Sequence, residues 1–219
     1  MRIAGPQVIS QIFLQTTPRK REDLPTRINR GRGTSFDPQM LNLDITDYWK
    51  PDVLVDLSAP LDHAQEFDTT RFGPLRLEPG RFDAIAAIDV LEHVGDLVKL
   101  MSNCLALLRV GGEFNIKVPY DLSYGAWQDP THVRAFNENS WLYYTEWFWY
   151  LGWNEARFEV ANLWFAFHPI GKEMSAAGQP LELILRTPRA VDAMDVVLRK
   201  RLLTAEERSK VETYLARAG

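Results

Sequence analysis

Apolar positions along the first half of the chain fall into short runs and one longer helical pattern. The runs MLNLDI (40–45), DVLVDL (52–57) and FDAIAAIDVL (82–91) each have the length and composition of a buried strand. Between residues 96 and 108 the apolar residues recur at spacings of three and four, which predicts a helix with one buried side. Gly111 and Gly112 follow it, and we expect them to end that helix.

The second half of the chain continues the alternation. EFNIKVPYD (113–121) predicts a strand, residues 138–152 predict a helix closed by Gly152, and FEVANLWFAFHP (158–169) and PLELILRTP (180–188) predict two strands. Residues 191–202 and 204–218 predict two amphipathic helices, the second opened by a Thr204 and Glu207 capping box. This order indicates an α/β fold with a mostly parallel sheet and an antiparallel final pair of strands.

Composition bounds the class of protein. A chain of 219 residues with 46% hydrophobic and 25% charged residues is typical of one globular domain with extensions. We expect an N-terminal arm at 1–26, the domain at 27–188 and a helical extension at 189–219. The net charge of -4 disfavours nucleic-acid binding, which calls for a basic face. The single Cys104 has no disulfide partner, and no apolar run is long enough for a signal peptide or a membrane span, so we expect a cytoplasmic protein with no membrane attachment.

Candidate binding residues come at the ends of the predicted strands. Asp44 in NLDI and Asp56 in LVDL each end a predicted strand, and an acidic side chain there can accept hydrogen bonds from the hydroxyls of a ribose. The alternative is that both aspartates cap helices or form turns. Upstream, Gly31 and Gly33 form a G-x-G arrangement, where glycine lets the backbone approach a ligand closely.

Three segments of the chain carry a resemblance to a known family: INRGRG, NLDITDYWKPDVLVDL and GRFDAIAAIDVLEHVGDLVKLMSNCLALLRVGGEFNIKVPY. The chain resembles the class I S-adenosylmethionine-dependent methyltransferases over roughly residues 27–187. The resemblance implies a Rossmann-like open, mostly parallel seven-stranded sheet with helices on both faces and an antiparallel final hairpin. It implies S-adenosylmethionine as cofactor, with its methionine part beside Gly31 and Gly33, its ribose on Asp44, and its adenine beside Asp56 and Leu57. Residues from Asp89 to His93 would face the sulfonium and the substrate. Arg30 and Arg32 depart from the family's glycine loop.

The turn DPTHVRAFN (129–137) is the best candidate for chemistry on the substrate. His132 follows a strand on the expected cofactor edge, and histidine titrates near neutral pH, so we predict that His132 is a general base. The alternative is a loop histidine hydrogen-bonded to Asp129 or to backbone. His93 is a second catalytic candidate, whereas Glu92 is expected to interact with a helix N-terminus. We expect no metal, because His132 and Asp129 have no third ligand at a recognisable spacing.

Substrate and partner residues are predicted from the same region. Asp129 and Arg134 would close over the substrate, and Tyr143 and Trp147 of the aromatic run WLYYTEWFWY would line its pocket, while Trp141 and Phe148 are expected in the core. The function predicted is methyl transfer to an O or N atom of a small molecule or glycan intermediate in a biosynthetic pathway. The alternative is a non-catalytic binding subunit with a degenerate glycine loop. With either function, the protein is a candidate homodimer through its aromatic or C-terminal helices.

Overall fold

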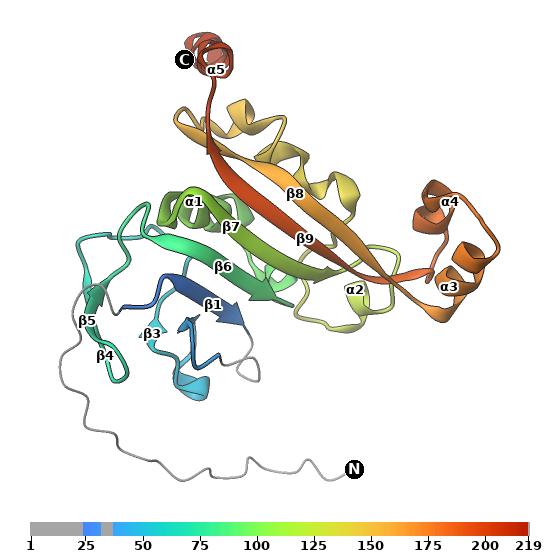
Figure 1. Ribbon diagram of the computed structural model, residues 1–219, viewed down its shortest axis with the longest axis horizontal. Helices are drawn as coiled ribbons and strands as arrows, with labels where there is room; N and C mark the ends of the chain where they lie inside the picture. The colour runs from blue at the N-terminus through green and yellow to red at the C-terminus, as the bar shows by residue number, and fades with distance from the viewer. Residues whose placement is uncertain (1–23, 32–36, 219) are drawn as a thin grey trace.

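A computed structural model describes residues 24–31 and 37–218 of the chain (Figure 1). Its main feature is a seven-stranded sheet in the order β3-β2-β1-β6-β7-β9-β8. The strands are β1 Arg27–Gly31, β2 Leu41–Asp44, β3 Val53–Leu54, β6 Phe82–Ile88, β7 Leu108–Pro119, β8 Ala156–Phe167 and β9 Val191–Leu202. Pairs among the first five are parallel, and β9 runs antiparallel to both β7 and β8. The predicted α/β fold with an antiparallel final hairpin is confirmed.

Short helices and one small hairpin complete the fold. The α-helices are α1 Leu97–Leu107, α2 Gly125–Gln128, α3 Pro169–Ala176, α4 Leu181–Arg186 and α5 Ala205–Ala218. The 3-10 helices are η3 Asp47–Trp49, η4 Leu91–His93, η5 Glu138–Tyr144 and η6 Phe148–Leu151, and the two-stranded hairpin is β4 Glu66–Thr69 with β5 Gly73–Arg76. Figure 1 shows α5 beyond one end of the long β8–β9 ribbon and α3 and α4 at its other end. No helix in the described part of the chain has the length and apolar character to cross a membrane.

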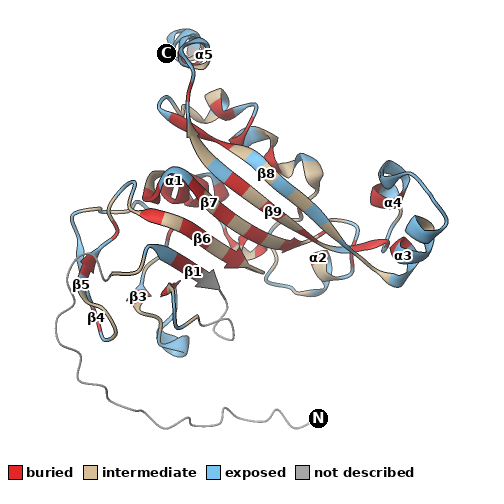
Figure 2. Cartoon of the chain, viewed as in Figure 1, coloured by how far each residue is buried: buried red, intermediate tan, exposed pale blue. Residues whose placement is uncertain are grey.

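The core lies between the sheet and the elements packed on it. Buried positions follow β6, β7 and β9 closely (Figure 2). Helix α1 contributes Leu97, Leu100, Met101, Cys104, Leu105 and Leu107 to this core, and Cys104 is a buried free thiol. Trp141 and Phe148 are buried as predicted, at 1% and 2% exposure. The core therefore fixes the inner strands whose carboxyl ends form one edge of the sheet.

Three predicted elements are wrong. Residues 191–202, predicted as a helix, form strand β9, and Leu181–Arg186, predicted within a strand, form helix α4. The helix α1 ends at Leu107, and Gly111 and Gly112 lie inside β7. Gly112 fits there because a Cβ would meet the backbone oxygen of Arg109 at 2.9 Å.

Two further predictions concern the aromatic segment and the C-terminal helix. The predicted helix over 138–152 is two 3-10 helices, although Gly152 ends the second in the left-handed conformation, at φ 73°. The capping box before α5 is confirmed, since the Thr204 hydroxyl accepts from the Glu207 N–H at 3.2 Å and the Glu207 carboxylate accepts from the Thr204 N–H at 2.9 Å. Most of the predicted N-terminal arm, 1–26, lies outside the described residues.

Candidate active site

A pocket of about 440 Å³ opens at the carboxyl edge of the parallel strands. It lies where the strand order reverses, since β2 and β3 extend the sheet to one side of β1 and β6 to the other. Ligands of open α/β sheets bind at this reversal point, outside the carboxyl ends of the strands. The lining residues are Leu43, Asp44, Ile45, Thr46, Trp49, Asp56, Ser58, Asp89, Val90, His93, Val94, Gly95 and Thr131.

Asp44 and Asp56 both line this pocket, as the sequence predicts for a ribose and an adenine contact. Asp44 is the last residue of β2, and its Oδ1 accepts from the Thr46 N–H at 3.0 Å. Asp56 follows β3, and its Oδ1 accepts from the N–H and the hydroxyl of Ser58 at 2.8 and 2.7 Å. Each aspartate thus shapes its own turn, which is the alternative raised for it from the sequence, and each also lines the pocket.

The other predicted cofactor residues are placed less directly. Leu57 is fully buried in the core between the lining residues Asp56 and Ser58. Gly31 ends β1 opposite Ile88 of β6, so the chain leaves β1 at the pocket edge. Gly33 lies outside the described residues. The contacts predicted for Leu57 and the glycine pair stay predictions.

Asp89 follows the last residue of β6 and lines the pocket. Its φ is 52°, in the left-handed region that few residues other than glycine and Asn or Asp adopt. Its N–H donates to the Lys117 carbonyl at 3.0 Å, which fixes this turn to β7. The turn directs the chain from β6 into η4, whose last residue, His93, also lines the pocket.

His93 is tied to the DPTH turn through one hydroxyl. The Thr131 hydroxyl donates to Asp129 Oδ1 at 2.7 Å and lies 2.9 Å from His93 Nδ1. The hydrogen bond from the Thr131 side chain is the main cause that lowers the pKa of Asp129 to about 2, so this carboxyl is ionised at neutral pH. His93 and Thr131 line the pocket, whereas Asp129 is not among the lining residues.

His132 packs behind His93. Its side chain is 7% exposed and is not part of the pocket lining. Its ring meets the His93 ring edge to face, with centroids 4.6 Å apart. Nδ1 lies 3.0 Å from the Ala126 carbonyl, and Nε2 lies 4.0 Å from Oε1 of Glu92, a residue only 1% exposed. The turn is thus docked against η4, to which the Val133 N–H also donates at the Glu92 carbonyl.

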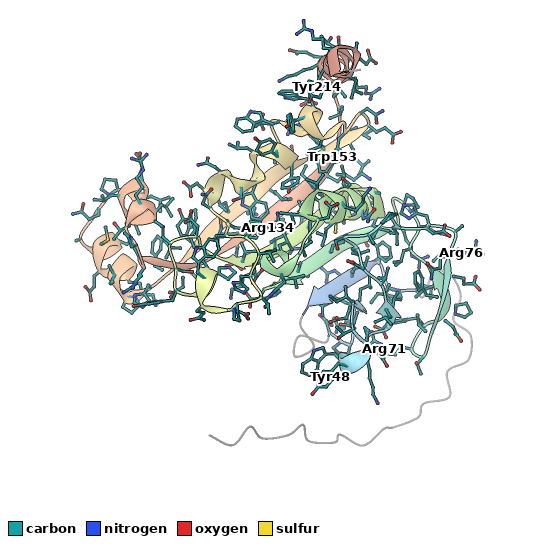
Figure 3. All side chains as sticks on the ribbon, turned by 180° about the vertical axis from the view of Figure 1, so that it is seen from behind. Tyr48, Arg71, Arg76, Arg134, Trp153 and Tyr214 are labelled. Atoms are coloured by element: carbon teal, nitrogen blue, oxygen red, sulfur yellow. The ribbon has the colours of Figure 1, made fainter. Side chains whose placement is uncertain are left out.

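The residues predicted to contact substrate separate into two groups. Arg134, labelled in Figure 3, donates to the carbonyls of Val94 and Gly95 at 2.8 and 2.7 Å and so holds the segment after η4 in place. Tyr143 and Trp147 pack edge to face on each other, at 45% and 43% exposure, and neither lines the pocket. Their predicted substrate contacts stay predictions.

Sequence reasoning did not select four residues of this region. Ile45 and Trp49 line the pocket, at 60% and 44% exposure, and their place shortly after Asp44 at a predicted strand end was a usable signal. Thr131 joins His93 to Asp129. Glu92 joins His93 and His132 in a cluster that no sequence spacing reveals, since the two histidines are 39 positions apart.

Comparison with known proteins gives one family and a set of similar folds. Residues 25–116 match the model of a methyltransferase domain. The chain is similar to an S-adenosylmethionine-dependent methyltransferase from Archaeoglobus fulgidus, with 13% identity, a TM-score of 0.49 and coverage of 80% of this chain and 86% of that one. For one from Mesorhizobium loti the identity is 16% and the TM-score 0.47, covering 82% and 94%. The search of curated proteins gives no match.

Proposed function

Because residues 25–116 belong to the methyltransferase domain family, we propose that this protein binds S-adenosylmethionine in the pocket at the sheet edge and transfers its methyl group to an acceptor O or N atom. The observation that carries the proposal is the position of Asp44. Its carboxylate ends β2 inside the pocket, at the reversal point where nucleosides bind in such sheets. The acceptor belongs to a small molecule or a glycan intermediate.

The pocket supports a bound nucleoside in two ways. The carboxylates of Asp44 and Asp56 can accept hydrogen bonds, one from ribose hydroxyls and the other from the exocyclic amine of adenine. Ile45 and Trp49 offer apolar surface against which the base can pack. Its volume of 440 Å³ also falls within the range of about 300–1,000 Å³ typical of small-molecule sites.

Methyl transfer requires no covalent bond between the protein and the reactants. The acceptor atom forms a bond to the methyl carbon as the carbon–sulfur bond breaks, S-adenosylhomocysteine leaves, and a protonated acceptor gives up its proton. The cofactor is already activated, so the chain contributes mainly positioning. On the acceptor side the pocket presents His93 and Thr131. The predicted general base His132 lies behind His93 and reaches the acceptor only through it, so its role as a base stays a prediction.

The alternative is a binding subunit that keeps the fold without catalysis. Arg30 and Arg32 favour it, because two guanidinium groups beside a cationic sulfonium are unfavourable unless they point to solvent or to the cofactor carboxylate. The two proposals differ in cofactor binding, since only the first requires it.

Calorimetric titration of the full chain with S-adenosylmethionine and S-adenosylhomocysteine separates them. We expect one nucleoside bound per chain, with the product held at least as tightly as the cofactor. Absence of heat with both nucleosides, on protein shown to be folded by circular dichroism, would reject the enzyme and leave the binding subunit.

A further inference from the structure

Glu92, His93 and His132 come together from two segments of the chain. Each offers one ligand atom, and these atoms all lie within 4.8 Å of one another. We propose that the three side chains form a binding site for a divalent transition-metal ion at the wall of the pocket. Two imidazoles and one carboxylate are a frequent ligand set for such ions in proteins.

His132 is held in the tautomer that a metal ligand needs. The Ala126 carbonyl can only accept a hydrogen bond, so the contact of 3.0 Å requires a proton on His132 Nδ1. The neutral ring then carries its lone pair on Nε2, the nitrogen 4.0 Å from Glu92 Oε1. Metal-binding histidines almost always donate their second ring N–H to a carbonyl or carboxylate in this way.

His93 is held in the same tautomer by a longer relay. Thr131 has one hydroxyl hydrogen, which it donates to Asp129 Oδ1 at 2.7 Å. Its oxygen can therefore accept at the 2.9 Å contact with His93, which requires a proton on Nδ1 and leaves the lone pair on Nε2. The carboxylate, hydroxyl and imidazole relay fixes the ring orientation as outer partners do in metal sites.

Glu92 supplies the negative charge of the set. It is 1% exposed, and its carboxylate would be the anionic ligand beside the two imidazoles. Ligand atoms of a tetrahedral ion lie about 3.4 Å apart for bonds of about 2.1 Å. The present spread of 4.8 Å therefore requires a small contraction of the side chains on binding.

The ligand set selects among metals. Imidazole nitrogen suits Zn²⁺, Fe²⁺ and Ni²⁺, whereas Mg²⁺ and Ca²⁺ prefer oxygen ligands. Three protein ligands leave at least one coordination position for another molecule. His93 lines the pocket, whereas its Nε2 and both carboxylate oxygens of Glu92 are buried, so the ion would lie behind the pocket wall.

The role of the ion rests on the proposed function. Because His93 lines the pocket, an ion bound to its buried Nε2 would hold that ring in place on the acceptor side of the site.

The test is a titration of chelator-treated full-length protein with Zn²⁺ and with Ni²⁺, in the absence of nucleoside. We expect one ion per chain for the wild type. The variants Glu92→Gln and His132→Gln should each weaken binding by about 100-fold, and Thr131→Val, which removes only the relay, by about 10- to 100-fold. His63→Gln is the matched control, because His63 lies outside the cluster and bonds the Leu77 carbonyl at 2.7 Å.

Two readouts keep the outcomes distinct. Circular dichroism and thermal melting identify a variant that fails to fold. In that case the test relies on the affinity of Thr131→Val for the ion and on the absorption spectrum of Co²⁺ bound to the wild type. Wild-type protein that binds no ion, or ion binding that Glu92→Gln and Thr131→Val leave at the level of His63→Gln, would overturn the metal site. Since no nucleoside is present, that result is independent of the cofactor titration.

Discussion

Replacing Asp44 by asparagine isolates the proposed ribose contact. Asp44 Oδ1 accepts from the Thr46 N–H at 3.0 Å, and an asparagine can keep that bond through its amide oxygen. The turn at the end of β2 should therefore survive. The second carboxylate oxygen becomes an NH₂ group, which cannot accept a hydrogen bond from a ribose hydroxyl, and the negative charge is lost.

The expected loss follows from the number and kind of bonds removed. Hydrogen bonds to a charged acceptor contribute about 1.5–3 kcal/mol each, and the partial exposure of Asp44 places the loss at about 1–3 kcal/mol. The dissociation constant for S-adenosylhomocysteine should rise roughly 5- to 150-fold. Asp44→Ala should lose at least as much, because it also removes the acceptor for Thr46.

Isothermal titration calorimetry with S-adenosylhomocysteine measures this change. Asp47→Asn is the control, since Asp47 begins the neighbouring η3, is exposed and does not line the pocket. Its affinity should equal that of the wild type. If Asp44→Asn binds within twofold of the wild type, the ribose assignment is refuted.

Three further predictions concern stability and assembly. Hydrogen bonding to Arg201 is the main cause that lowers the pKa of Glu207 from 4.5 to about 2. The ionised Glu207 therefore stabilises the folded protein fully above pH 4.5, and this contribution is lost as the pH falls towards 2. In urea unfolding, Glu207→Gln should be less stable than the wild type by about 2 kcal/mol at pH 7, and the difference should disappear near pH 2. Gly171→Ala should lower the melting temperature by several degrees, because the new Cβ would lie 2.0 Å from the Ala190 carbonyl oxygen; an unchanged melting curve would contradict that packing. If the exposed aromatic surface forms a homodimer, sedimentation equilibrium should find a dimer that Trp147→Ser weakens, and a wild-type monomer at all concentrations would reject it.

The sequence predicts the inner sheet well because its strands are short apolar runs with polar ends. It misses β1, whose residues RINRG contain only one large apolar side chain, Ile28. The strand is nevertheless central, because Ile28 is fully buried and the buried Asn29 donates its side-chain amide to Asn42 of β2 at 2.9 Å. Such a pairing across strands satisfies a polar residue in the core and leaves no mark in an apolar pattern.

Residues 181–186 form a helix where a strand was predicted, and residues 191–202 form a strand where a helix was predicted, because of tertiary contacts. In β9 the buried residues Met194, Val196 and Leu198 alternate, yet Val197 beside them makes the apolar run compatible with a helix. Pairing with β7 on one side and β8 on the other selects the strand. Leu181–Arg186 alternates like a strand but has no such partner and forms a short helix.

The candidate site is predictable only where residues end strands. Asp44, Asp56 and Asp89 lie in the pocket because the carboxyl ends of β2, β3 and β6 share one edge. The cluster of His93 and His132 depends instead on the path of 120–136, which returns to the sheet through a bridge between Tyr120 and Phe136. No local pattern encodes that return.

A crystal structure of the complex with S-adenosylhomocysteine tests the central claim most directly. We predict the nucleoside in the pocket at the sheet edge, with ribose hydroxyls within hydrogen-bond distance of Asp44 and adenine between Ile45 and Asp56. A nucleoside bound elsewhere on the chain, or an empty pocket at saturating ligand, would contradict the account.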